Sequence, residues 1–204
     1  LLAEQGHEVI GVHMKLHDVD EGAAGHCCGL DDALDARRVA ERLGIPFYVM
    51  NLKTAFQRAV MDDLADTYLA GRTPNPCVQC NGVLKFRVLL ARARALGAEK
   101  LATGHYCRIV GEPGARRLAV ARDPKKDQSY FLFPMTPDAV EHTLFPLGDL
   151  QKTEVRALAQ RFDLVTAEKP ESQEICFIPD DDHAAFVRRH RPDADTSGWI
   201  VDED

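Results

Sequence analysis

Two cysteines that lie three positions apart, Cys77 and Cys80, are the residues of this sequence best suited to chemistry. They belong to the stretch 73–81, in which Pro74 and Pro76 fix the backbone and remove two N–H donors. We therefore expect a rigid loop between two helices rather than helix or central strand. Such a cysteine pair can be a redox couple, half of a metal site, or a nucleophile beside a residue that tunes it.

A third thiol, Cys176, lies far along the chain in the irregular segment 164–180. Functional groups often sit on loops that a scaffold positions, although one packing cysteine and one incidental pair would also fit these residues taken alone. A further group, His26 with Cys27 and Cys28, could bind a soft metal, but incidental cysteines in a loop are the simpler interpretation.

Composition limits the classes of protein to which the chain can belong. Its 204 residues include six cysteines and no apolar run of membrane-spanning length, and no signal peptide is expected. These features favour reduced or metal-bound thiols in a cytoplasmic protein without a membrane partner over a secreted disulfide framework. The net charge of −7 argues mildly against a dedicated nucleic-acid-binding protein, although the basic stretches 85–94, 116–126 and 188–191 could form a local basic face.

Alternating strands and helices are expected to position the cysteines. Apolar runs predict strands at 9–14, 46–52 and 100–103, and amphipathic patterns predict helices at 31–43, 54–70 and 83–96. This order is typical of an α/β fold with a Rossmann-like parallel sheet flanked by helices. Ligands of such sheets bind beyond the carboxyl ends of the strands, so Met14, Gly104 and His105 are expected near a nucleotide-sized crevice.

The second half of the chain is expected to be less regular. A hairpin is predicted from strands 106–110 and 117–121, followed by a polar loop at 123–130, short helices within 136–163, a helix near 181–190 and a strand near 198–202. We expect an α/β catalytic domain at 1–143, a small helical extension at 144–190 that carries Cys176, and the start of a further domain at 191–204. A helix end without a start at 1–6, and a last strand without a partner, predict that the chain is cut at both ends.

Five short segments share their order and spacing with one known family. They are residues 11–15, 71–76 followed by Cys80 and Asn81, 102–106, 126–131 and 172–178. Each segment is weak evidence alone, but the five in register resemble the tRNA 2-thiouridylase family, whose members thiolate the wobble uridine of certain tRNAs. The resemblance extends over essentially the whole chain and implies an adenine nucleotide alpha hydrolase-like fold.

The resemblance also implies an ATP-dependent mechanism. ATP, with Mg²⁺, would adenylate the oxygen at C2 of the uracil ring, and a cysteine persulfide loaded by a sulfur-donor protein would supply the sulfur. By position, Cys176 resembles the persulfide carrier and Cys80 resembles the nucleophile that attacks it, which leaves a Cys80–Cys176 disulfide. Such chemistry needs two thiols that can reach bonding distance, at least one of them as a thiolate.

Binding residues are implied by the same segments. Met14 and Gly104 resemble the adenine and ribose contacts of the family. The target base would lie beside Asn75, Pro76 and Cys77, after leaving its stack. The expected tRNA contacts are His105, Lys126, Asp127 and Gln128.

Two departures from the family pattern matter. The glycine-rich pyrophosphate loop of the family would precede residue 1, so this chain is expected to bind ATP poorly, and the C-terminal tRNA-binding domains are also missing. In addition, position 77 is Cys where a common form of the family has Asp. Cys77, Cys80 and Cys176 could then hold a [4Fe–4S] cluster whose open iron binds sulfide, or a zinc ion.

Other functions remain compatible with the residues. One is a different adenylating enzyme of the pyrophosphate-loop superfamily that acts on a small carbonyl compound, which would have no use for the Cys80–Cys176 pair. Another is a redox-sensing or metal-binding module without catalysis.

Overall fold

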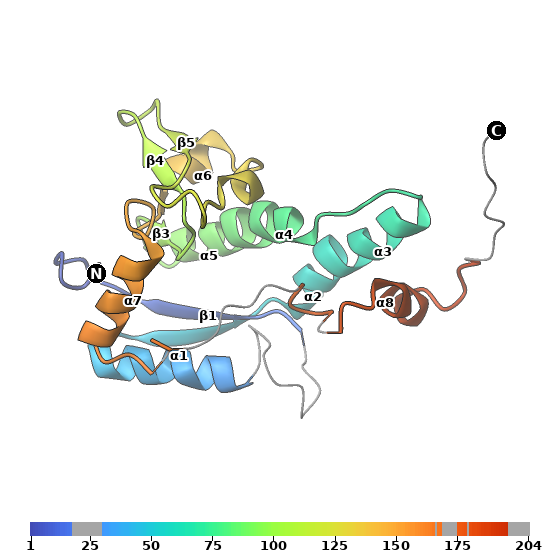
Figure 1. Cartoon of the computed structure of the whole chain (residues 1–204), viewed down its shortest axis with the longest axis horizontal. Coiled ribbons are helices and arrows are strands. Elements are labelled where there is room, and N and C mark those ends of the chain that lie inside the picture. The colour runs from blue at the N-terminus through green and yellow to red at the C-terminus, as the bar shows by residue number, and fades with distance from the viewer. Residues whose placement is uncertain (18–29, 166, 169–174, 179, 196–204) are drawn as a thin grey trace.

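The computed structural model describes residues 1–17, 30–165, 167–168, 175–178 and 180–195 (Figure 1). The group formed by His26, Cys27 and Cys28, and the strand expected near 198–202, lie outside these ranges.

Two parallel strands joined by a helix form one layer of the fold. Strand β1 (Gly11–Lys15) pairs in parallel with β2 (Phe47–Asn51), in a register that sets Gly11 opposite Phe47. Helix α1 (Leu30–Leu43) connects them and lies along one side of the pair, and the helix from α4 to α5 lies on the other side (Figure 1). These three elements confirm the predicted strand–helix–strand order, because parallel neighbours need such a crossover.

A continuous helical run follows β2. It consists of α2 (Lys53–Phe56), the π-helical segment η1 (Gln57–Met61) and α3 (Asp62–Leu69). Phe56, Val60 and Leu64 are almost fully buried on one face, as the apolar pattern predicts. Leu69, further along the same helical run, is exposed because it lies in the last turn before the chain leaves the helix at Gly71.

The cysteine stretch is where the sequence-based prediction was wrong. Instead of a loop up to residue 81, a helix begins at Pro76: α4 (Pro76–Gln79) continues into the π-helix η2 (Cys80–Leu89) and α5 (Leu90–Ala95). Proline is compatible with the first helical position because its missing N–H would have no partner there. Asn75 caps this helix, its side-chain oxygen accepting a hydrogen bond from the Val78 N–H at 3.2 Å.

The second half contains two further strand pairs. Strand β3 (Leu101–Ala102) pairs in parallel with β6 (Thr143–Leu144), a short strand that the sequence did not predict. The predicted hairpin is present as antiparallel β4 (Arg108–Val110) and β5 (Arg117–Ala119). The remaining elements are the 3₁₀ turn η3 (Ser129–Leu132) and the helices α6 (Pro137–Glu141), α7 (Lys152–Arg161) and α8 (His183–His190). No helix in the described ranges is both long enough and apolar enough to cross a bilayer.

Polar contacts fasten α8 to α3. His190 Nε2 lies 2.7 Å from Asp62 Oδ1, and the guanidinium of Arg191 donates to Asp62 and to both oxygens of Asp66. Hydrogen bonds from His190 and Arg191 lower the pKa of Asp62 against the opposing effect of burial. Beneath these contacts Phe186 and Val187 of α8 are buried in a core cluster with residues of α3.

One core cluster joins the strand ends to the helices. Leu16, Leu52, Phe56, Val60 and Leu84 form its buried centre. These residues come from the chain just after β1 and β2, from α2 and η1, and from η2. Full burial of side chains of this size stabilises a fold by about 1.5–3 kcal/mol each, so this cluster fixes the cysteine helix relative to the strands.

Candidate active site

Cys77 and Cys80 occupy one side of the helix that begins at Pro76. Residues three positions apart in a helix are neighbours on its surface. Cys77, in the first turn, is exposed, whereas Cys80 is half-buried and packs against the core cluster centred on Phe56. The capped start of the helix therefore presents two thiols at different depths.

Cys176 is brought to the same cluster. It is half-buried and, like Cys80 and Met14 of β1, it packs against the buried residues around Phe56. The residues that follow it hold it there. The Phe177 ring makes edge contacts with Phe56 at a centroid distance of 5.3 Å, and Ile178 is fully buried in the α3–α8 cluster.

The thiols influence each other's ionisation. Burial raises the pKa of the Cys80 thiol to about 11, against the opposing charge of the Lys85 ammonium. Cys176 and Cys77 also raise the pKa of Cys80, as burial does. Partial burial also raises the pKa of Cys77, with Cys176 reinforcing this effect and Lys85 opposing it. The three cysteines and Lys85 thus form one electrostatic group, in which Cys80 is a neutral thiol at neutral pH.

Lys85 is held by a short chain of polar contacts. Its ammonium lies 3.3 Å from His105 Nε2, and His105 Nδ1 lies 2.7 Å from Thr103 Oγ1. Burial, together with the Lys85 charge, lowers the pKa of His105 to about 3, so the imidazole is neutral. An ammonium only donates, so Nε2 must accept from Lys85 and Nδ1 carries the proton that it donates to Thr103.

The loop that is predicted to contact tRNA is held in shape by hydrogen bonds to its own side chains. Asp127 accepts hydrogen bonds from the Ala121 N–H and the Ser129 hydroxyl, each at 2.7 Å. The side-chain oxygen of Gln128 accepts from the Tyr106 N–H at 3.0 Å. These two side chains therefore shape the loop. Lys126, the residue just before them, is partly exposed.

The two predicted nucleotide contacts lie on different strand pairs. Met14 is half-buried near the end of β1, and Gly104 is exposed just after β3. A Cβ built on Gly104 would meet only Leu147 Cδ1, at 3.7 Å. His105, the next residue, links this end of β3 to the cysteine helix through Lys85.

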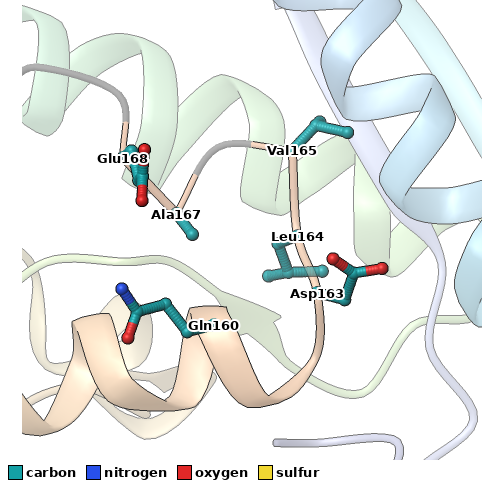
Figure 2. Close-up of a pocket in the computed structure, with 6 residues that line it drawn as sticks. All are labelled: Gln160, Asp163, Leu164, Val165, Ala167 and Glu168. Atoms are coloured by element: carbon teal, nitrogen blue, oxygen red, sulfur yellow. The ribbon is translucent and has the colours of Figure 1, made fainter.

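No group of three or more His, Cys, Asp or Glu side chains within the described ranges is arranged to hold a metal ion. The geometry therefore gives no support to a cluster or zinc ion on Cys77, Cys80 and Cys176. A cavity of about 330 Å³ lies elsewhere, at the end of α7 (Figure 2). Its lining contains none of the predicted site residues and consists of Gln160, Asp163, Leu164, Val165, Ala167 and Glu168.

Comparison with known proteins identifies the family. The model of the family described as tRNA methyl transferase HUP domain matches residues 1–180. The chain belongs to this family. It is 54% identical to a protein of Geobacter metallireducens over 99% of the chain and 57% of that protein, and 48% identical to one of Clostridium acetobutylicum over 100% of the chain and 58% of that protein. Both relatives are named tRNA-specific 2-thiouridylase MnmA.

These findings confirm the resemblance carried by the five segments and the α/β fold class. A third relative, from Magnetococcus marinus, has the same name and is 51% identical over 100% of the chain and 58% of its own length. The chain spans somewhat more than half the length of these curated relatives.

The sequence reasoning missed Lys85 and Thr103, which the structure links to His105. Lys85 lies five positions after Cys80. In an α-helix such residues face different sides, but the i→i+5 hydrogen bonding of a π-helix brings them together, and both lie in η2. The sequence gives no signal for a π-helix, so this proximity could not be predicted.

Proposed function

We propose that this chain provides the sulfur-transfer centre of an ATP-dependent tRNA 2-thiouridylase. The observation that carries the proposal is the packing of Cys80 and Cys176, far apart in sequence, against one core cluster beside Met14. The family and the names of the relatives support a reaction on tRNA. A methyl transfer, which the family description mentions, needs no pair of thiols, whereas sulfur transfer through a persulfide does.

In the proposed reaction, the uridine is first activated and then receives sulfur from a persulfide. The C2 oxygen of the wobble uridine attacks ATP, which forms an adenylated uridine and releases pyrophosphate. A sulfur-donor protein transfers a sulfur atom to Cys176 as a persulfide. The Cys80 thiolate attacks Sγ of that persulfide, forms the Cys80–Cys176 disulfide and expels hydrosulfide. Hydrosulfide adds at C2 and displaces AMP, and an external dithiol reduces the disulfide for the next turnover.

The residues of this chain activate and orient the thiols. Because Cys80 is protonated at neutral pH, its deprotonation must accompany substrate binding. The Lys85 ammonium favours the thiolate, and His105 positions Lys85 rather than accepting the proton. The contact of His105 with tRNA stays a prediction.

Binding of nucleotide and base is assigned by position. Met14 offers a half-buried thioether, and Gly104 offers an exposed backbone without a side chain, which suits contacts with adenine and ribose. Asn75, Pro76 and Cys77 would border the target base after it leaves its stack. Lys126, Asp127 and Gln128 would face the tRNA, with Asp127 and Gln128 acting mainly through the loop that they shape.

The domain division is part of the proposal. Residues 1–143 would bind nucleotide, 144–190 would carry Cys176, and 191–204 would begin another domain. A reducing cytoplasm is the expected compartment, because the mechanism starts from reduced thiols. Mg²⁺ would accompany ATP.

A thiolation assay tests the proposal. The protein at its natural full length is incubated with tRNA, ATP and a persulfide donor, and 2-thiouridine is quantified by mass spectrometry of the nucleosides. We expect Cys80→Ser and Cys176→Ser to abolish product, whereas the control Cys107→Ala, in a different core cluster, retains it. Full activity of Cys176→Ser would overturn the persulfide route. Iron and zinc analysis of anaerobically purified protein, beside a Cys77→Asp variant, separately tests the cluster.

A further inference from the structure

Two large aromatic rings, Tyr130 and Phe133, lie exposed beside the cysteine helix. Each is 66% exposed, and their ring centroids are 6.3 Å apart. Tyr130 also meets the edge of the Phe131 ring at 5.4 Å. Between them Leu132 is fully buried in a core cluster. The 3₁₀ turn η3 is therefore anchored by Leu132, while a group of aromatic rings points outward.

This segment is joined directly to the candidate active site. The side-chain amide of Asn81, the residue after Cys80, donates to the Phe131 carbonyl at 3.2 Å. A Cβ added to Gly82 would approach Pro134 Cβ to 3.0 Å, so the two backbones pack closely. Both α4 and η2 contact η3, and in Figure 1 the region leading into α6 lies over the helix that starts at α4. The segment that carries the exposed rings thus packs against the helix that carries Cys77 and Cys80.

The charges next to the rings favour a negatively charged partner. The exposed Lys125 and the partly exposed Lys126 lie in the same loop. The acidic side chains of that loop accept hydrogen bonds from protein groups: Asp123 from the N–H groups of Lys125 and Lys152, and Asp127 from Ala121 and Ser129. The two carboxylates are thus engaged within the protein and are less exposed than Lys125, which is the side chain of these four that reaches furthest into solvent.

We propose that Tyr130 and Phe133 form a stacking platform for an unpaired base of the RNA substrate, next to the base that reaches the thiols. The inference rests on the proposed function and adds a subsite to it. Aromatic faces bind bases of any identity, and proteins commonly recognise single-stranded RNA loops in this way. A target base that leaves its stack exposes its neighbour, and the platform replaces the lost stacking partner. Two rings flanked by lysines suit one or two nucleotides better than a protein partner, whose interface would need roughly 1,000 Å².

Fluorescence of a labelled RNA tests the platform. An anticodon stem-loop that carries 2-aminopurine beside the wobble uridine is titrated with the protein at its natural full length. Stacking on an aromatic ring is expected to change the 2-aminopurine signal on binding. Tyr130→Ala and Phe133→Ala should each raise the Kd for this RNA about tenfold, which is the loss expected for one base stack. Each should also abolish the change in fluorescence. Tyr130→Trp should retain both, and Tyr48→Ala, an exposed tyrosine of β2, should behave as wild type.

The outcomes separate the platform from the proposed function. If wild type forms 2-thiouridine and the two alanine variants bind RNA as tightly as wild type, the platform is wrong and the proposed function stands. If wild type neither binds nor thiolates any tRNA, both are wrong. If the alanine variants lower the melting temperature of the full-length protein and leave RNA affinity unchanged, the rings contact another part of the polypeptide and the platform is again overturned.

Discussion

Cys80 lies within the continuous helical run from Pro76 to Ala95, whereas Cys176 lies in a short turn closed by a hydrogen bond from the Ile178 N–H to the Ile175 carbonyl. The first is fixed by a capped helix and a buried face, and the second by the two side chains that follow it. Short segments with few anchors open at lower free energy than core helices. The difference suits the proposed roles, because the sulfur carrier must meet a donor and the nucleophile need not move.

The largest expected effect comes from the anchor of Cys176. Phe177→Ala removes ring contacts with Phe56 and Phe186, both at 5.3 Å, and should lower the free energy of unfolding by about 3 kcal/mol. Urea denaturation measures this loss. Mild oxidation should form the Cys80–Cys176 disulfide more slowly, as followed by non-reducing mass spectrometry. Leu96→Ala, an exposed position, is the control, and an unchanged rate of disulfide formation in Phe177→Ala would show that the anchor does not position Cys176.

The second largest expected effect is a pH dependence of the free energy of unfolding. It is caused by His105, which contacts Lys85 in the helix that carries Cys80. Its pKa in the folded protein, about 3, is below the usual value of 6.5, so its contribution to stability is full above about pH 6.5 and is lost as pH falls toward 3. Between pH 7 and pH 5 this loss amounts to about 2 kcal/mol. His105→Gln should flatten the pH dependence of unfolding by that amount. An unchanged slope would contradict the buried neutral imidazole.

The sequence predicted the scaffold better than the site. Strand periodicity at β1 and β2 and the apolar face with Phe56 and Val60 depend on local pattern, and the structure agrees. The loop expected around Cys77 failed because Pro76 is as compatible with a helix start as with a loop, and only the capping contact of Asn75 distinguishes them. Strand β6 was missed because two residues carry no periodic signal.

The shared packing of Cys80 and Cys176 and the contact of Lys85 with His105 could not come from local pattern. Cys176 and Phe177 pack against the same core cluster as Cys80, and no local pattern predicts this packing. That the two thiols react with each other stays a prediction of the family resemblance. The position of Lys85 depends on a π-helix and on a contact with His105, which follows β3. Both are products of long-range packing, on which the spacing of residues carries little information.

A smaller effect is expected from the cation beside Cys80. Lys85→Met removes the charge that opposes burial and should raise the pKa of Cys80 further. A shift of about one pH unit would slow alkylation by iodoacetamide about tenfold at a fixed pH below the pKa. The rate is measured against pH in a Cys77→Ser background, with Lys85→Arg as the variant that keeps the charge. Equal pH profiles for Lys85→Met and wild type would exclude an electrostatic role.

The smallest effect should come from the polar contacts of α8. Arg191→Ala removes ion pairs with Asp62 and Asp66, but these groups are partly exposed, and such pairs contribute less than about 1 kcal/mol. The buried Phe186 and Val187 should keep α8 in place. We therefore expect Arg191→Ala to leave the rate of Cys80–Cys176 disulfide formation near that of wild type, in contrast to Phe177→Ala. If Arg191→Ala slows this reaction as strongly as Phe177→Ala, then the position of α8, more than the local packing of Phe177, determines where Cys176 lies.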